Sequence, residues 1–420
     1  MKEINEIYID LRDEIFEALD VTVLSEVSNK ELEKQLLNSV NLLVDNKQLQ
    51  VSTLKRSELV NGMFNELRGL GPLQELIEDE NISDIMVNGH KNVFIEVRGK
   101  LEKSNVTFVN EKQLNTLARR IASGVGRRID DLTPLCDARL SDGSRVNIVA
   151  PPLAIDGTTI SIRKFKEQKI KLNDLVSYHS LSFEMAKLLS LAAFCRCNIL
   201  ISGGTGSGKT TLLNALSGFI DEGERVVTIE DAAELQLQQP HVVRMETRQA
   251  NVEGRGEVTA RELVINALRM RPDRIIIGEC RGAEAFEMLQ AMNTGHDGSM
   301  STLHANSPRE AISRVESMVM MANSNLPLTA IRRTIVSSVD IIIQIKRLHD
   351  GSRKVTNITE VVGMEGDNVV MEDIFKFISS GLEEEKITGK FETPGLSSRS
   401  IIYERSRFYN LKDSIKDIFL

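Results

Sequence analysis

Aromatic residues are scarce in this 420-residue sequence, which contains no Trp and only 4% Phe, Trp and Tyr together. Proteins that hold single-stranded nucleic acids stack the bases on aromatic side chains, so we expect no such platform here. Cysteine is also rare, and the four Cys residues include no C-x-x-C pair, which excludes the common zinc and dithiol motifs. No apolar run approaches the roughly 20 residues of a membrane helix. Any membrane association is therefore expected to be peripheral or to depend on a partner.

The charge balance and composition are those of a globular protein. Lys and Arg number 52 against 60 Asp and Glu, which gives a formal net charge of −8. A protein that coats nucleic acid needs a positive field, so this balance argues against that class and leaves only a local basic groove open. The acidic first residues lack the apolar core of a signal peptide, and the cysteine usage suits a reducing compartment. We expect a cytoplasmic protein.

The sequence pattern predicts an α/β protein with several regions. Apolar residues first recur at helical spacing, and two short strands around an Asn-Gly turn then open a mixed α/β segment. After a Lys-rich stretch, apolar strands alternate with helices, which indicates a parallel sheet covered on both faces. We expect helices over 1–65, a small α/β domain over 66–165, a linker or hinge over 166–180, and a strand–helix domain over 181–375. We expect an irregular, charged tail over 376–420, for which packing on the core is left open.

One glycine-rich segment gives the strongest functional indication. It fits G-x-x-x-x-G-K-[ST], follows a predicted strand and opens a predicted helix, as a phosphate-binding loop requires. Glycines let backbone N–H groups approach phosphate oxygens, and the helix N-terminus adds partial positive charge. We expect ATP and Mg²⁺, with Lys209 at the β/γ-phosphates and the Thr210 hydroxyl on the metal. The expected nucleotide-binding residues are Gly203, Gly204, Thr205, Gly206, Ser207, Gly208, Lys209, Thr210 and Thr211.

Two acidic strand ends are candidates for the carboxylate that acts beside the phosphates. One predicted strand ends at Glu279, and the strand before it ends in Glu230, Asp231 and Glu234. The carboxyl ends of parallel strands converge on the crevice where ligands bind. Glu279 would orient or deprotonate the attacking water, or hold Mg²⁺ through water. A common pattern has Asp one position earlier, where this chain has Gly278. A solvated acid at a strand end is the alternative for each.

Two histidines, His296 and His304, flank a short predicted strand. They would sense the γ-phosphate or carry hydrogen bonds between subunits. The alternative for each is a structural histidine with satisfied hydrogen bonds.

Taken together, these motifs resemble the secretion ATPase superfamily, which powers type II secretion, type IV pili and type IV secretion. In that family the Walker A loop is followed by an Asp box, a Walker B strand ending in Gly-Glu and a His box. Here these correspond to residues 228–235, 275–281 and 294–304, so the Gly-Glu pair fits the family. The resemblance implies a RecA-like P-loop ATPase domain preceded by a smaller α/β domain and a helical extension.

Within the superfamily, the sequence is most similar to the branch that serves tight-adherence (Tad/Flp) pili, the CpaF-like ATPases. The segments that carry this similarity are 136–147, 157–165, 301–314 and 350–367. The resemblance implies a homo-hexameric motor that powers pilus assembly, and retraction is left open. Its partners would be inner-membrane platform proteins at the inner face of the cell membrane, with no direct contact to nucleic acid.

The resemblance also gives arginines a role. ATP would lie at subunit boundaries, where the small domain supplies Arg139, Arg145 and Arg163 to the phosphates, and a guanidinium there stabilises charge on the γ-phosphate. A surface arginine is the alternative for each. Weaker candidates are Arg244, Arg248, Arg255, Arg269 and Arg271.

Other functions remain open at this point. A type II or type IV secretion motor that exports proteins or DNA would share the same ATPase core. A helicase-like nucleic-acid translocase is disfavoured by the net charge and the missing Trp. A nucleotide-gated scaffold that binds ATP without hydrolysing it is disfavoured by the presence of Glu279.

Overall fold

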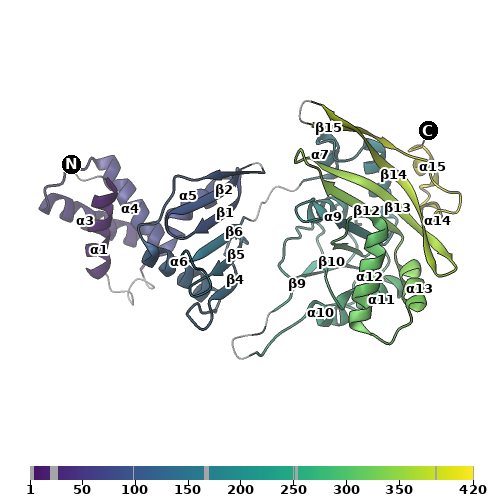
Figure 1. The fold of residues 1–420 in the computed structure, drawn as a ribbon, viewed down its shortest axis with the longest axis horizontal. Helices are drawn as coiled ribbons and strands as arrows, with labels where there is room; N and C mark the ends of the chain where they lie inside the picture. Colours follow the sequence, from purple (N-terminus) through teal and green to yellow (C-terminus); the bar gives the residue numbers. More distant parts are fainter. Residues whose placement is uncertain are drawn as a thin grey trace. The chain divides into compact units, whose positions relative to one another are not determined.

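The computed structural model describes residues 4–18, 27–97, 99–164, 170–248, 250, 254–383 and 386–419. The chain divides into two compact units, residues 1–167 and 168–420 (Figure 1). Each unit has its own core. Residues 166–169, which begin the expected linker, lie outside the described residues, as does residue 165. No helix within the described ranges is both long and apolar enough to span a bilayer.

The first unit begins with three helices that share an apolar core. They are α1 (Ile4–Ala18), α3 (Asn29–Asn46) and α4 (Thr53–Arg68), and Ser28 and Ser52 cap the second and third by accepting backbone N–H groups. Leucines, isoleucines and valines at helical spacing face inward, as the sequence predicts.

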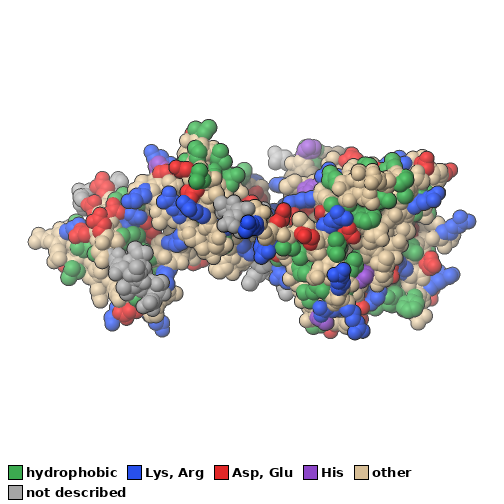
Figure 2. All heavy atoms as spheres, turned by 90° about the horizontal axis from the view of Figure 1, so that it is seen from below, with side chains coloured by type: hydrophobic (Ala, Val, Ile, Leu, Met, Phe, Trp, Pro, Cys, Tyr) green, Lys and Arg blue, Asp and Glu red, His purple; other side chains and the backbone are tan. Residues whose placement is uncertain are grey.

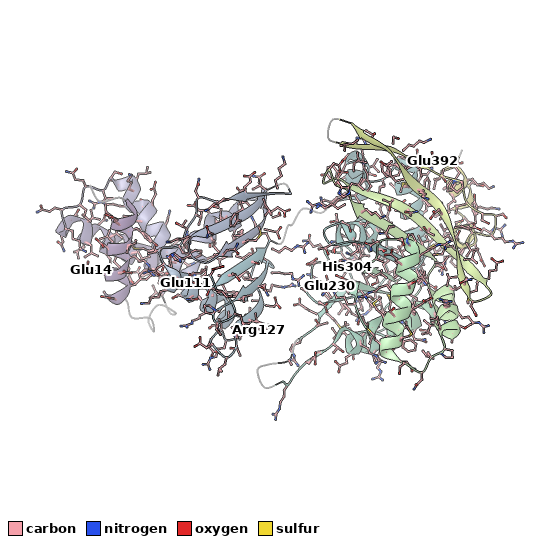
Figure 3. All side chains as sticks on the ribbon, in the orientation of Figure 1. Glu14, Glu111, Arg127, Glu230, His304 and Glu392 are labelled. Atoms are coloured by element: carbon pink, nitrogen blue, oxygen red, sulfur yellow. The ribbon has the colours of Figure 1, made fainter. Side chains whose placement is uncertain are left out.

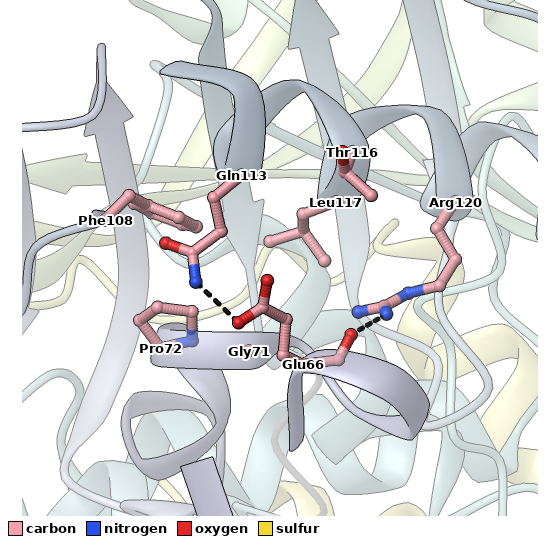
Figure 4. A pocket seen from close by; sticks show the side chains of 8 residues that line it. All are labelled: Glu66, Gly71, Pro72, Phe108, Gln113, Thr116, Leu117 and Arg120. Carbon is pink, nitrogen blue, oxygen red and sulfur yellow. Dashed lines mark hydrogen bonds between the residues drawn. The ribbon is translucent and has the colours of Figure 1, made fainter. Parts of the chain in front are cut away.

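Glu66, near the end of α4, ties these helices to the small domain. Its carboxylate accepts hydrogen bonds from Tyr8 and Arg12 of α1 and, over 2.8 Å, from Gln113 of α6 (Glu111–Gly124). Arg120 of α6 donates to the backbone carbonyl of Glu66 (Figure 4). Burial and the Glu66 charge raise the pKa of Tyr8. The buried carboxylate therefore links helical extension and small domain within one unit.

The small domain is a six-stranded sheet with helix α6 on one face. The strand order is β3-β2-β1-β6-β5-β4, and the register confirms the predicted hairpin around the Asn-Gly turn. Buried residues of alternate positions face α6, and the opposite positions are polar and more exposed. The elements are η1 (Gly71–Leu73), α5 (Gln74–Glu78), β1 (Ile82–Asn88), β2 (Asn92–Val97), β3 (Lys100–Lys103), β4 (Leu135–Arg139), β5 (Arg145–Val149) and β6 (Thr159–Arg163).

Among the described residues, the second unit forms a nine-stranded sheet of order β15-β14-β13-β12-β7-β11-β10-β8-β9. The run from β12 to β9 is parallel, as the strand–helix alternation predicts. The strands are β7 (Ile199–Gly203), β8 (Val226–Glu230), β9 (Val242–Glu246), β10 (Arg274–Cys280), β11 (Met300–Leu303), β12 (Ile341–Arg347), β13 (Arg353–Glu365), β14 (Asn368–Glu383) and β15 (Lys386–Glu392).

Helices cover both faces of this sheet (Figure 1). In β7, Ile199 and Ile201 pack into the core on one face, and Leu200 packs into the core on the other. A strand buried on both faces reads as a continuous apolar run, which is why it was predicted. The helices are α7 (Leu172–Ser177), α8 (Phe183–Phe194), α9 (Lys209–Ser217), α10 (Ala260–Ala267), α11 (Glu284–Asn293), α12 (Pro308–Ala322), α13 (Leu328–Ser338), α14 (Ile401–Phe408) and α15 (Lys412–Lys416).

Two expectations about the less regular segments were wrong. Residues 376–420 are not an irregular tail, because they complete β14, form β15 and add α14 and α15, whose Ile402 and Ile415 are buried in the main core. The expected linker contains helix α7, whose Leu172 and Leu175 also enter that core. In both segments a few apolar residues among many charged ones meet partners far away in the sequence, which local pattern does not reveal.

Candidate functional site: a phosphate loop with two carboxylates

The glycine-rich loop connects the buried strand β7 to helix α9. Gly206 and Gly208 have φ values of 67° and 101°, a region that side chains rarely adopt. A Cβ on Gly203 would lie only 2.4 Å from the carbonyl oxygen of Ile345 in the neighbouring strand β12. The loop thus needs glycine for its backbone conformation at two positions and for close packing at a third.

Lys209 lies inside this loop. The residue is only 8% exposed, and its Nζ donates to the carbonyl oxygens of Gly203 and Gly204, each at 3.1 Å. The same Nζ is 3.4 Å from Nε2 of His304. These carbonyl oxygens hold the ammonium group at the mouth of the loop, where a phosphate would offer it a charge-assisted partner.

His304 and Glu279 lie together at the carboxyl ends of the neighbouring parallel strands β11 and β10. Nε2 of His304 is 2.9 Å from Oε1 of Glu279, and Arg281 donates to the other oxygen over 3.0 Å. Arg281 also reaches Asp231 over 3.3 Å. Burial, followed by the charge of Lys209, lowers the pKa of His304. The imidazole thus lies between the loop lysine and the strand-end glutamate and close to both, while Oε1 of Glu279 has no hydrogen-bond partner among the described residues.

Glu230, at the end of β8, is buried beside this group. One carboxylate oxygen accepts backbone N–H groups of Glu234 and Leu235 at 2.6 and 2.8 Å, and the other has no hydrogen-bond partner among the described residues. Burial raises the pKa of Glu230, and the two N–H groups partly oppose it. Figure 3 labels Glu230 and His304 on the same side of the second unit. A buried, unsatisfied oxygen is costly, which suits a site that receives a cation or water.

Glu230 also accounts for the glycine that precedes Glu279. A Cβ placed on Gly278 would lie 3.0 Å from Cγ of Glu230 and 3.6 Å from its Oε2. The Glu230 side chain thus fills the space where other phosphate-loop proteins carry the Asp of the common pattern. The carboxylate next to position 278 therefore comes from Glu230 at the end of β8.

The two predicted histidines do not meet. His304 follows the carboxyl end of β11, at the edge that carries the glycine-rich loop. His296 precedes the amino end of β11 and lies 3.3 Å from the carbonyl oxygen of Ala291. The amino end of β11 lies a strand length away from its carboxyl end, so His296 belongs to a turn remote from the glycine-rich loop.

Comparison with known proteins shows the family of this chain. Residues 66–394 match the protein family described as "Type II/IV secretion system protein". The chain belongs to this family. It is 34% identical over 329 residues to the type IV secretion system protein VirB11 of Bartonella henselae, covering 70% of this chain and 92% of that protein. It is 32% identical over 294 residues to the conjugal transfer protein TrbB of Rhizobium radiobacter, covering 69% and 86%.

A crystal structure of the pilus retraction motor PilT with bound ADP shares the fold. The TM-score is 0.50 at 19% identity, over 82% of this chain and 89% of that one. The expected RecA-like α/β fold and the membership of the secretion family are confirmed. These matches do not distinguish the Tad/Flp branch.

The arginines of this family member fall in two groups. Arg139, Arg145 and Arg163 stand directly opposite one another on β4, β5 and β6 of the first unit. Cross-strand partners point to the same face, so the three form one basic row. The weaker candidates lie in the second unit: Arg244 on β9, whose charge lowers the pKa of Glu230, Arg248, which donates to the carbonyl oxygen of Gly256, and Arg255, Arg269 and Arg271.

The donor set of this secretion-family protein fits magnesium rather than zinc. Within the described ranges no group of three or more His, Cys, Asp and Glu side chains is suited to hold a metal ion. Mg²⁺ usually keeps several waters and takes one or two protein oxygens, often with substrate phosphates. The Thr210 hydroxyl in the first turn of α9, with Glu279 and the unpartnered oxygen of Glu230 nearby in the same sheet edge, matches that preference.

Sequence reasoning missed three residues of this edge. Arg281 lies just after the end of β10, and its ion pairs with Glu279 and Asp231 depend on how the ends of β8 and β10 lie beside each other. Arg347 and Arg353 were not singled out either. Their contacts with the glycine-rich loop arise from the pairing of β12 with β7, which the sequence does not specify.

Proposed function

We propose that this protein is an ATPase motor of a type IV pilus or secretion system that hydrolyses ATP at the loop 203–211. The observation that carries the proposal is the alignment of Lys209, His304 and Glu279 at one sheet edge. Phosphate binding needs a cation in a cradle of backbone N–H groups, which Lys209 provides. The attacking water needs a carboxylate close by, which Glu279 provides.

Each residue then has a defined task. The loop N–H groups and Lys209 hold the phosphates, and Lys209 exchanges its carbonyl partners for phosphate oxygens. Thr210 would hold Mg²⁺, which neutralises charge on the phosphates when it is bound, and Glu279 and Glu230 would reach the metal through water. Glu279 orients the attacking water, and His304 links its position to that of Lys209. Arg281 fixes the second oxygen of Glu279.

We further propose that the protein works as a ring hexamer with ATP at subunit boundaries. Arg139, Arg145 and Arg163 would be supplied by a neighbouring subunit. Their alignment in one row of the sheet, which Asp84 of β1 continues beside Arg163, supports joint action on one anionic group. The first unit, residues 1–167, would move against the second unit, residues 168–420, as the nucleotide changes.

The motor would assemble Tad/Flp-type pili, acting in the cytoplasm on platform proteins of the inner membrane. The similarity of segments 136–147 and 350–367 to that branch supports this choice. Acidic and basic side chains are interspersed on the visible face of each unit (Figure 2), which suits protein partners better than a nucleic-acid track. The second candidate is a secretion motor for proteins or DNA, favoured by the identity with VirB11 and TrbB.

Replacing Lys209 by Ala tests nucleotide binding. We expect affinity for a fluorescent ATP analogue to fall at least about a hundredfold, because one buried charge-assisted contact to the phosphates is lost. Equilibrium titration measures this directly. The matched control is Lys376→Ala on β14, which should bind like the wild type. If Lys209→Ala binds ATP as tightly as the wild type, the loop is not the nucleotide site.

A further inference from the structure

The hairpin formed by β12 and β13 places two arginines side by side. Arg347 ends β12, Arg353 begins β13, and the two are direct cross-strand partners. The turn between them is fixed, because Asp350 accepts the backbone N–H of Ser352 at 2.9 Å and that of Ile387 on β15 at 2.8 Å. The two guanidinium groups therefore project from a rigid support.

Both arginines lie against the glycine-rich loop. Arg353 donates from Nε to the carbonyl oxygen of Gly206 over 3.0 Å, and a Cβ on Gly208 would lie 3.4 Å from Cδ of Arg353. A Cβ on Gly206 would lie 3.7 Å from Nη1 of Arg347. These two glycines are the ones with positive φ, so the hairpin covers the part of the loop that curves around its ligand.

Arg347 is exposed and has no acidic partner among the described residues. Its guanidinium makes no hydrogen bond or ion pair within the part of the chain that the structure describes. Like charges directly opposite each other on neighbouring strands are destabilising. An anion at the loop would remove this cost by accepting from the arginine pair.

The strand order determines which end of the nucleotide the hairpin faces. β12 lies on one side of β7, and β11 and β10, which carry His304 and Glu279, lie on the other. If the γ-phosphate of a bound triphosphate faces Glu279 at the carboxyl ends of these strands, its α-phosphate lies toward the β12–β13 hairpin. We propose that Arg347, supported by Arg353, binds the α-phosphate of the nucleoside di- or triphosphate within the same subunit. This inference rests on the proposed ATPase function.

The test compares the Kd values of the Arg347→Ala variant with those of the wild type, for ADP and for a non-hydrolysable ATP analogue. We expect the Kd values for ADP and for a non-hydrolysable ATP analogue to rise by the same factor, about tenfold, because both carry the α-phosphate. The KM for ATP should rise similarly while kcat at saturating ATP is unchanged. Arg347→Lys should recover most of the affinity, since it keeps the charge. Arg407→Ala on α14, an exposed arginine with no side-chain partner among the described residues, is the control.

Three results would overturn the inference. Unchanged affinity in Arg347→Ala shows that the arginine does not contact the nucleotide. Weaker binding of the ATP analogue alone, or a fall in kcat without a change in KM, places the arginine at the γ-phosphate instead. Lys209→Ala separates this failure from that of the ATPase proposal: if the wild type binds and Lys209→Ala does not, the loop is the nucleotide site whatever Arg347 does. A wild type that binds no nucleotide overturns both.

Discussion

At the scale of single residues, the site depends on one pair of neighbours, Glu230 and Gly278. The Glu230 carboxylate is buried and has one oxygen without a partner among the described residues, and the glycine leaves it room. An acid at position 278 would bring a second carboxylate into the same space. Two desolvated carboxylates in contact do not ionise together, and one takes up a proton.

The contact between Glu230 and Gly278 leads to a prediction that differs from what the common phosphate-loop pattern suggests. Gly278→Asp restores the acid that many phosphate-loop proteins carry, yet we expect ATP turnover to fall about tenfold or more, because the new side chain displaces Glu230. Steady-state phosphate release measures it. Gly363→Ala, a glycine of β13 with open space around its Cα, should retain full activity. Undiminished turnover in Gly278→Asp would mean that Glu230 does not need its present position.

The sequence predicts those site residues that belong to a local motif, and it does not predict contacts between residues far apart in the sequence. The eight-residue loop is recognisable because every position has a local reason: glycine for dihedrals, lysine and threonine for phosphate and metal. The contact of Lys209 with His304 spans 95 positions, and that of Arg281 with Asp231 spans 50. Such contacts follow from the order of strands in the sheet, which no local pattern encodes.

At the scale of elements, the strong predictions concern strands buried on both faces. β7, β8 and β10 are continuous apolar runs, and β7 and β10 are each followed by a helix. Thr259 and Glu262 form a capping box at α10. β14 is not apparent in the sequence because, among its residues of described burial, only Ile374 and Phe375 are buried, and Phe375 stacks on Phe419. A strand with so small a buried face resembles a charged loop until its partner strands are known.

The C-terminal helices are held by two buried carboxylates. Glu360 of β13 accepts the Ser400 hydroxyl at 2.9 Å and the Ile401 N–H at 2.6 Å, which caps α14. Arg405 of α14 reaches Asp340 over 3.0 Å, and burial raises the pKa of Asp340 to about 6. The last elements are therefore an integral layer of the second unit.

At the scale of the whole molecule, the proposed ring makes catalysis a property of two subunits. Arg163→Ala should bind ATP normally but release phosphate at least about a hundredfold more slowly, as loss of an arginine at the γ-phosphate does. Mixing it with Lys209→Ala subunits should restore activity, since about a quarter of boundaries in a randomly assorted ring combine an intact loop with an intact arginine. The phosphate-release rate of the mixture is the measurement. Two inactive variants that stay inactive together would show that the arginine does not act across the boundary.

The central claim is that one edge of the sheet binds ATP and splits it with the help of Glu279. The most direct measurement is ATP binding and phosphate release by Glu279→Gln, which keeps the size of the side chain and removes its charge. We predict that the variant binds an ATP analogue within about twofold of the wild-type Kd and loses at least about a hundredfold in turnover, because the water is no longer oriented by a carboxylate. Turnover equal to that of the wild type would contradict the account.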